Sequence, residues 1–358
     1  SGASNVAVGY LSLDANTTGA TNVAVGRGSL GANTTASNNV AVGDLALVAN
    51  TTGANNVAIG RDSLATNTTA SGNTGVGESA LQLTTTGCCN TAVGNGALQA
   101  NTTGDDNVAV GQAALAFATT ADGNTAVGRF SMFCNTTASG NISVGAYSLF
   151  NNTEGFSNVA IGACQPSGYG AALELNTTGD CNVAVGNGAL RSNTTADNNT
   201  AVGTLASGCN TTGTNNTSVG KQALQANTTG GGNTAVGANA GDAVTTGSNN
   251  TALGFESAGK LTTGGDNVAV GRAALLDTTT QSGNVAIGVE ALENNTADEN
   301  VAVGKQTLND NTSGTENTAV GSYALDANTT GAKNTSLGSQ SLSANTTGEK
   351  NTAVGSNA

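Results

Sequence analysis

The stretch NVAVGYLSLDANTTGAT, residues 5–21, decides the fold of this chain, because it is one copy of a unit that recurs throughout the sequence. Its first five residues follow the pattern Asn-[Val/Thr/Ile]-small-[Val/Ile/Leu]-Gly. Most copies continue to a leucine at the ninth position and to Asn-Thr-Thr at the twelfth to fourteenth positions. Internal repeats of this kind dictate the architecture of a chain. We number the positions of each unit from its leading asparagine, and a column is one position taken through all units.

The period of the repeat is 17 residues, with two exceptions. The motif starts 21 times and defines 20 complete units. One step is seven residues longer, which places an insertion at residues 165–171, next to the only proline, and a later step is one residue shorter. The leading column is always asparagine, beginning with Asn5, Asn22, Asn39, Asn56, Asn73, Asn90 and Asn107. The sequence therefore predicts a single continuous repeat array over residues 1–358.

The length of the unit selects the fold class. A unit of 17 residues is too short for a helical repeat, which needs two helices. Short apolar runs closed by glycine indicate strands. One coil cannot bury its own apolar face, so coils must stack on one another. We therefore predict an all-β solenoid, a β-roll or β-helix of about 20 coils, whose chains form trimers or stack head to tail.

The apolar columns predict the core. Side chains alternate along a strand, so the second and fourth positions share one face. The fourth column is always Val, Ile or Leu, and we expect it to point inward together with the leucines of the ninth column. The predicted core residues of the first coils are Val8, Leu13, Val25, Leu30, Val42 and Leu47.

The remaining constant columns are small or polar. Glycine fills the fifth column, as at Gly9, Gly26, Gly43 and Gly60, and we expect positive φ or close backbone approach there. The leading asparagines are expected at corners, where asparagine tolerates the left-handed region, with their amides bonded into a ladder. The third column, always Ala, Ser or Gly, has two interpretations. It is either buried in a narrow cross-section or packed against another chain.

Composition and charge exclude several functional classes. The net charge is −13 and the 10 basic residues are scattered, so there is no nucleic-acid footprint. No apolar run approaches the roughly 18 residues of a membrane span, and Ser1 does not begin a signal peptide. Histidine is absent and the acidic residues fall mostly at variable positions, which argues against acid–base catalysis and metal binding. We expect a protein that is not an enzyme and uses no cofactor.

The six cysteines suggest some disulfide bonds. Cys134 and Cys209 share the eleventh column but lie about 19 Å apart by strand spacing, beyond the about 7 Å that a disulfide allows between Cα atoms. Cys164 and Cys181 belong to the unit that carries the insertion, and they are the candidate disulfide. The neighbouring pair at residues 88 and 89 suits a vicinal bridge, two free thiols or a bond to another chain equally.

Asn-Thr-Thr fits three roles: an N-glycosylation acceptor, a row of threonines for ice binding, and a corner of the coil. The first threonine is present in every complete unit, whereas the asparagine gives way to Val244 and Leu261, so the fold does not depend on a sugar. We therefore expect a semi-exposed corner. The two threonines point to opposite faces, which makes ice binding the weakest of the three roles. The candidate glycosylation sites are Asn16, Asn33, Asn50, Asn67, Asn101, Asn135, Asn176, Asn193, Asn210, Asn227, Asn328 and Asn345.

Three phrases carry a resemblance to known repeats: NVAVGYLSL (residues 5–13), NTAVGNGAL (90–98) and NTAVGSYAL (317–325). They resemble the head repeats of trimeric autotransporter adhesins and, equally, the Asn-Thr-Ala-Val-Gly repeats of phage and bacterial tail-fibre-like proteins. The resemblance covers residues 5–358, although the present unit is longer than that of the adhesin heads. It implies three chains, each a left-handed β-roll, around a threefold axis, in an extracellular fibre or head.

These observations predict a non-enzymatic structural fibre or filament, located outside the cell or on a cell or virion surface and built from copies of this chain. The alternative is a trimeric adhesin head or tail-fibre shaft that binds a cell-surface receptor or glycan, with recognition either at residues 165–171, where Pro166 and Tyr169 lie, or outside this chain. An ice-binding protein is the third candidate. No capping elements bound the array, as expected either of a fragment or of a head-to-tail filament.

Overall fold

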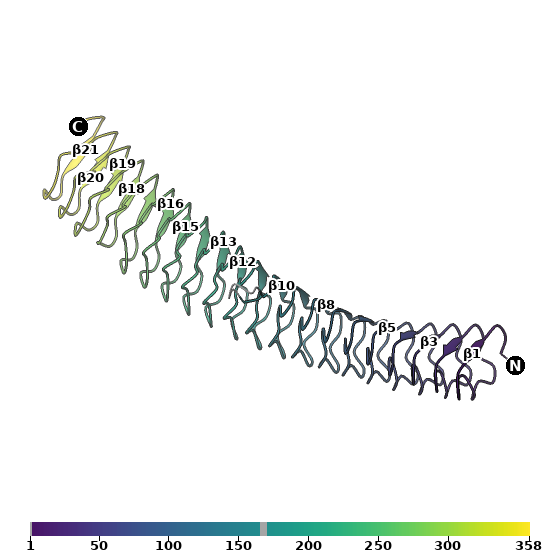
Figure 1. The fold of residues 1–358 in the computed structure, drawn as a ribbon. Helices are drawn as coiled ribbons and strands as arrows, with labels where there is room; N and C mark the ends of the chain where they lie inside the picture. The colour runs from purple at the N-terminus through teal and green to yellow at the C-terminus, as the bar shows by residue number, and fades with distance from the viewer. Residues whose placement is uncertain (1, 165–169) are drawn as a thin grey trace. The chain divides into compact units, whose positions relative to one another are not determined.

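The computed structural model describes residues 2–164 and 170–358, and it shows a parallel β-solenoid. About 20 coils of about 17 residues each are stacked, which confirms the predicted fold class, and none of the described residues forms a helix. The coils divide into two compact units, Ser1–Asn182 and Val183–Ala358, and each unit is described by itself. Figure 1 shows one strand label after another along each stack.

Each coil contributes one strand of three residues. The first unit contains β1 (Val6–Val8), β2 (Val23–Val25), β3 (Val40–Val42), β4 (Val57–Ile59), β5 (Thr74–Val76), β6 (Thr91–Val93), β7 (Val108–Val110), β8 (Thr125–Val127), β9 (Ile142–Val144) and β10 (Val159–Ile161). The second unit contains β11 (Val183–Val185), β12 (Thr200–Val202), β13 (Thr217–Val219), β14 (Thr234–Val236), β15 (Thr251–Leu253), β16 (Val268–Val270), β17 (Val285–Ile287), β18 (Val301–Val303), β19 (Thr318–Val320), β20 (Thr335–Leu337) and β21 (Thr352–Val354). Within each unit, strands pair parallel and in register, as Val6 does with Val23 and Val183 with Thr200.

The face of each strand that points inward is the opposite of the predicted one. The third column is buried, and Ala24 has no exposed surface. The fourth column lies outside: Val8 is 57% exposed, and Val25 and Val42 are half-buried on the outer face. These three valines are not core residues, so the prediction for them is wrong.

A narrow interior explains why the small residue faces inward. Gly75 replaces alanine in the third column, where a Cβ atom would lie 2.6 Å from the Ser63 Oγ atom and 3.6 Å from the Leu64 Cγ atom. A valine has no room at this position, because interiors are close-packed and resist added volume. The small third column therefore packs inside its own coil and not against another chain.

Leucines of the ninth column fill the core, as the sequence predicts. Leu30 and Leu47 have no exposed surface, and Leu13 in the first coil is 9% exposed. Their backbone is left-handed, with φ of 50° at Leu30 and 51° at Leu47. A left-handed leucine costs about 1–2 kcal/mol, whereas burying its side chain contributes about 1.5–3 kcal/mol. Burial therefore offsets the backbone strain in the coils that carry leucine at this position.

Two consecutive coils move the core side chain to a different column. Gly241 and Ala258 occupy the ninth column, and Val244 and Leu261 replace asparagine in the twelfth. The latter two are each 1% exposed and belong to the buried core of the second unit. A Cβ atom at Gly241 would lie 3.5 Å from the Val244 Cγ2 atom. The twelfth column therefore supplies the apolar volume that the ninth column lacks.

This exchange predicts that substitutions at the two columns are coupled. Leu261→Asn is expected to lower the free energy of unfolding by about 2–4 kcal/mol, because it removes a buried side chain and buries an amide between Val244 and Thr278. Adding Ala258→Leu is expected to recover at least half of that loss. Urea unfolding of the full chain, followed by circular dichroism, measures both effects. Strictly additive changes in the free energy of unfolding would show that side chains of the ninth and twelfth columns do not fill the same part of the core.

The leading asparagines form a buried hydrogen-bond ladder. The side-chain oxygen of Asn22 accepts a bond from the backbone N–H of Asn39 at 2.9 Å, and the Asn22 amide donates to the Ala36 carbonyl at 2.9 Å. The predicted ladder is therefore present, but the asparagines do not turn corners. The left-handed residue is the one before each of them, such as Asn38 with a φ of 63°. The fully buried members of the predicted set are Asn22, Asn39, Asn56, Asn73, Asn90 and Asn107, and Asn5 is half-buried.

The glycines of the fifth column combine positive φ with close backbone approach, as predicted. The φ angle is 136° at Gly9, 132° at Gly26, 142° at Gly43 and 132° at Gly60. A Cβ atom at Gly9 would lie 2.6 Å from the carbonyl oxygen of Gly26 in the next coil. Only glycine adopts this conformation without strain, which explains why the column has no exceptions.

Candidate functional site

The outer surface of a coil has three sides. The sheet face carries the second and fourth columns, which flank the buried third column. The variable face carries the sixth, seventh, tenth and eleventh columns. The threonine side carries the exposed residues from the thirteenth column onward. A ligand or partner that binds along the stack contacts one of these three sides, because the interior is filled.

The variable face holds most of the side chains that are able to anchor a ligand. Eight of the 10 aromatic residues and eight of the 10 basic residues of the chain fall in its four columns. The aromatic residues are Tyr10, Phe117, Phe130, Phe133, Tyr147, Phe150, Phe255 and Tyr323, and the basic residues are Arg27, Arg61, Arg129, Arg191, Lys221, Lys260, Arg272 and Lys305. In repeat proteins, variation and insertions gather on the face that binds. The variable face is therefore the candidate recognition surface.

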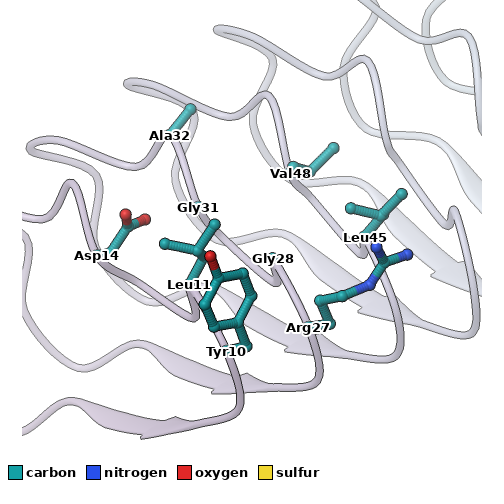
Figure 2. Close-up of a pocket in the computed structure, with 9 residues that line it drawn as sticks. All are labelled: Tyr10, Leu11, Asp14, Arg27, Gly28, Gly31, Ala32, Leu45 and Val48. Atoms are coloured by element: carbon teal, nitrogen blue, oxygen red, sulfur yellow. The ribbon is translucent and has the colours of Figure 1, made fainter.

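Hollows form on this face where one coil lacks side chains that its neighbours carry. A hollow of about 360 Å³ lies over the first coils of the first unit. Figure 2 shows Tyr10 and Asp14 on one side of it and Arg27 on the other, with Gly28 and Gly31 between the flanking coils. The two glycines supply no side chain, so the hollow stays open.

Ion pairs connect neighbouring coils along the variable face. The Arg27 Nε–H donates to Asp44 Oδ1 at 2.8 Å, and Lys260 Nζ lies 2.7 Å from Asp277 Oδ1. The hydrogen bond from Arg27 is the main cause that lowers the pKa of Asp44, and the same bond raises the pKa of Arg27. These side chains are largely exposed, so the pairs contribute little to stability. They do neutralise charge along the face.

Two hollows of the second unit each contain an aspartate of the tenth column. Asp242 lines a hollow of about 270 Å³, and Asp326 lines one of about 290 Å³. Burial is the largest cause that raises the pKa of both carboxyl groups. The buried Oδ1 atom of Asp326 has no hydrogen-bond partner.

The candidate glycosylation asparagines lie inside the coils and not at semi-exposed corners. The Asn50 amide donates to the Asn33 side-chain oxygen at 3.0 Å and to the Gly53 carbonyl at 2.9 Å. The same carbonyl accepts a bond from Asn39, so two asparagine ladders meet at the fifteenth column. A sugar on a buried amide is incompatible with these bonds. Fully buried are Asn33, Asn50, Asn67, Asn101, Asn135, Asn176, Asn193, Asn210, Asn227 and Asn328, whereas Asn16 and Asn345 are half-buried.

The two threonines of Asn-Thr-Thr have different roles. The hydroxyl of the first donates to a carbonyl of the next coil, as Thr34 does to Thr51 at 3.2 Å. This bond between coils explains why the first threonine is constant. The second is exposed, as at Thr52. The threonine side thus offers ice a single row of exposed second threonines.

All six cysteines are free thiols, and the predicted Cys164–Cys181 bridge is not formed. These two residues occupy the seventh and seventeenth columns, which lie beyond opposite ends of the strands, so the length of a strand separates them. The Cys89 thiol donates a hydrogen bond to the Cys88 Sγ atom at 3.4 Å, and the two thiols form no disulfide. The hydrogen bond with Cys89 is the largest cause that raises the pKa of Cys88 to about 12, which makes this thiol a poor nucleophile.

The insertion interrupts the coil directly after the seventh column, next to the variable face. Residues 165–169, which include Pro166 and Tyr169, lie outside the described residues, so recognition at this segment stays a prediction. Gly170 and Ala171 are buried where the chain rejoins the coil, and the Ala171 N–H donates to the carboxylate of Glu174 at 3.2 Å.

The sequence did not predict that the sheet face and the variable face are the surfaces able to contact a partner. The exposed fourth column was assigned to the core, because alternation along a strand does not say which face points inward. The variable face had a readable signal, since its columns are the ones that change most in size and charge between units.

The comparisons with known proteins supply no function. No protein-family model matches the chain, and no curated protein matches it. Within residues 2–164 and 170–358, no group of three or more His, Cys, Asp or Glu side chains is arranged to hold a metal ion. In that same portion, no helix combines the length and apolar character needed to cross a membrane. A function for this chain is therefore argued from its residues and geometry.

Proposed function

We propose that the protein is a non-enzymatic, extracellular structural fibre component whose copies pack side by side through their sheet faces. The observation that carries the proposal is the fourth column. It is Val, Ile or Leu in all 21 strands, although it lies on the outer face, half-buried at Val25 and exposed by 38% at Val93 and 37% at Val110. A solvated surface would admit polar side chains. A constantly apolar exposed column therefore favours contact with another surface.

The dimensions of the sheet face suit such a contact. Ten strands about 4.8 Å apart, each about 10 Å long, give the first unit a strip of roughly 480 Å². This lies within the 300–600 Å² typical of the largest apolar patch on a monomer. Among the described strands, β1 to β21, none contains an ionisable residue. Two such faces pack about 10 Å apart, and their flanking columns extend the contact toward the ~800 Å² per partner of a standard interface.

The constant columns support a structural role. The asparagines of the first and twelfth columns form ladders between coils, the fifth-column glycines allow close approach, and the ninth-column leucines fill the core. Each of these recurring residue types therefore stabilises the stacking of coils. The alternative, a trimeric adhesin head or tail-fibre shaft, would use the same sheet face around a threefold axis. The extracellular location rests on the resemblance of the repeats.

The assembly is tested by placing charge on the sheet face. Val93→Lys combined with Val110→Lys is expected to convert wild-type assemblies into single chains, because two buried lysines would have no partner at the interface. Light scattering coupled to size-exclusion chromatography gives the mass, and electron microscopy shows the fibres. A mass of three chains would favour the adhesin-like trimer over an open fibre.

The matched control places the same charge on another side of the same coils. Asn95→Lys combined with Gln112→Lys alters exposed sixth-column residues of the variable face, and it is expected to leave assembly unchanged. A wild-type chain that stays single at every concentration would contradict self-association. Equal assembly by both double variants would show that the sheet face is not the contact.

A further inference from the structure

Five aromatic side chains gather on the variable face of three consecutive coils in the first unit. Phe133 and Phe150 occupy the tenth column, with ring centroids 5.3 Å apart and planes 8° from parallel. Phe130 and Tyr147 occupy the seventh column with centroids 5.4 Å apart, and Phe117 meets Phe133 edge to face at 4.8 Å. We call these five residues the aromatic strip. It holds half of the aromatic residues of the chain within residues 117–150.

The aromatic strip is not needed to fill the core. Leu115, Met132 and Leu149 occupy the ninth column of the same three coils, and none of them has exposed surface. Phe117 is 50% exposed, and the other four rings are half-buried on the outer surface. Large rings held at a surface by one another present apolar area that water solvates poorly, which is characteristic of a recognition site.

The charge around the aromatic strip indicates a neutral ligand. Among the variable-face columns of these three coils, Arg129 is the only ionisable residue besides Tyr147 and Cys134. Its guanidinium lies 4.6 Å from the centroid of Phe130 and is held by that ring. Gln112 and Asn151 add amide groups at the margins. With a net charge of −13, the chain as a whole repels polyanions.

The repetition of the strip indicates an elongated ligand. Its rings recur in the same columns of successive coils, about one strand spacing apart along the stack. A chain of β-linked pyranoses advances by a similar length for each sugar. Each sugar offers an apolar C–H face to aromatic rings and a rim of hydroxyl groups to amides and arginine. A globular ligand would not require the same rings to repeat along the stack.

We propose that the aromatic strip, Phe117, Phe130, Phe133, Tyr147 and Phe150, binds a neutral polysaccharide lying along the coil stack. Arg129, Gln112 and Asn151 hydrogen-bond the sugar hydroxyls beside the rings. This binding is independent of assembly through the sheet face, because the two faces carry different columns of the coil.

Depletion of the full chain from solution by insoluble cellulose and by chitin tests the proposal. The wild-type chain is expected to bind at least one of the two polymers, and Phe117→Ala combined with Phe133→Ala is expected to bind at least about tenfold more weakly. Circular dichroism checks that the variant is folded. Should the double variant unfold, Phe117→Ala alone serves, because that ring is half-exposed and outside the core.

The control is Phe255→Ala, since Phe255 is 49% exposed on the variable face of the second unit but belongs to no aromatic cluster there. It is expected to bind as the wild type does, and so is the Val93→Lys, Val110→Lys variant, which keeps the aromatic strip. Failure of the wild type to bind either polymer would overturn the proposal, as would equal binding by the Phe117 variant. Loss of binding in the sheet-face variant would assign binding to the assembly and not to the strip.

Discussion

Replacing Asn73 by alanine is expected to lower the free energy of unfolding by about 2–6 kcal/mol, because it leaves two buried backbone groups unpaired at about 1–3 kcal/mol each. The Asn73 side-chain oxygen accepts the backbone N–H of Asn90 at 2.9 Å, and its amide donates to the Gly87 carbonyl at 2.8 Å. Asparagine and alanine differ by the whole amide, so no remaining atom reaches either group.

The fifth coil is a sensitive place for this substitution. In most coils the fifteenth-column carbonyl also accepts a bond from the twelfth-column asparagine, as Gly53 does from Asn50. In the fifth coil that position is Thr84, whose buried hydroxyl oxygen has no hydrogen-bond partner. Asn73 is therefore the side-chain donor to the Gly87 carbonyl. When Asn73 is replaced, this coil has no twelfth-column asparagine to bond the carbonyl instead.

Urea unfolding and amide hydrogen exchange measure the effect of Asn73→Ala. Exchange should rise first at Asn90 and in the coils on either side, because coils of a solenoid contact only their neighbours. The control is Thr86→Ala in the same coil, an exposed threonine whose loss is expected to change stability by less than about 0.5 kcal/mol. Similar losses for both variants would mean that the ladder contributes no more than surface residues.

The ladder also explains where the structure tolerates irregular columns. The side-chain oxygens of Asn67, Asn101 and Asn227 are buried without partners. Each is followed in the next coil by a residue that cannot donate from that position as asparagine does, such as Val244 after Asn227. Unsatisfied oxygens therefore mark the ends of ladder segments. A carbonyl-type oxygen tolerates this more readily than a buried N–H would.

Periodicity made much of the fold predictable from sequence. Strict recurrence of Asn, Gly and Leu fixed the coil length, the parallel strands and the buried leucine column, as Leu30 and Gly26 show. These features depend on what repeats along the chain, and a single sequence contains that information. The insertion after Cys164 was likewise visible as a break in the period.

The orientation of side chains was not predictable in the same way. Alternation places the Val25 and Ala24 side chains on opposite faces of the strand, but it does not say which face points inward. Hydrophobicity favoured valine for the interior, and this choice was wrong. The deciding quantity was the width of the coil, which leaves room in the third column only for small side chains such as alanine and serine. Asn33 was predicted at a semi-exposed corner, whereas its side chain bonds Asn16 and Asn50 of the two neighbouring coils, contacts that a sequence does not reveal.

Substituting alanine for Gly60 is expected to cost about 2–6 kcal/mol, combining about 1–3 kcal/mol of backbone strain with about 1–3 kcal/mol of overpacking. The φ angle of Gly60 is 132°, a conformation that residues with a Cβ atom rarely adopt. The added Cβ atom would lie 2.6 Å from the carbonyl carbon of Gly77 and 3.0 Å from the backbone nitrogen of Glu78. Backbone atoms of the next coil cannot move aside without disturbing the stack.

Gly123→Ala separates the two causes of that loss. Gly123 also has a positive φ, of 63°, but a Cβ atom there would meet nothing within 4 Å. The same column accepts asparagine at similar angles, as at Asn55 with a φ of 60°, so this alanine is expected to cost only about 1 kcal/mol. Thermal and urea unfolding of the two variants give the comparison. Equal destabilisation would place the whole effect in backbone conformation, and would remove close approach between coils as the reason why the fifth column is always glycine.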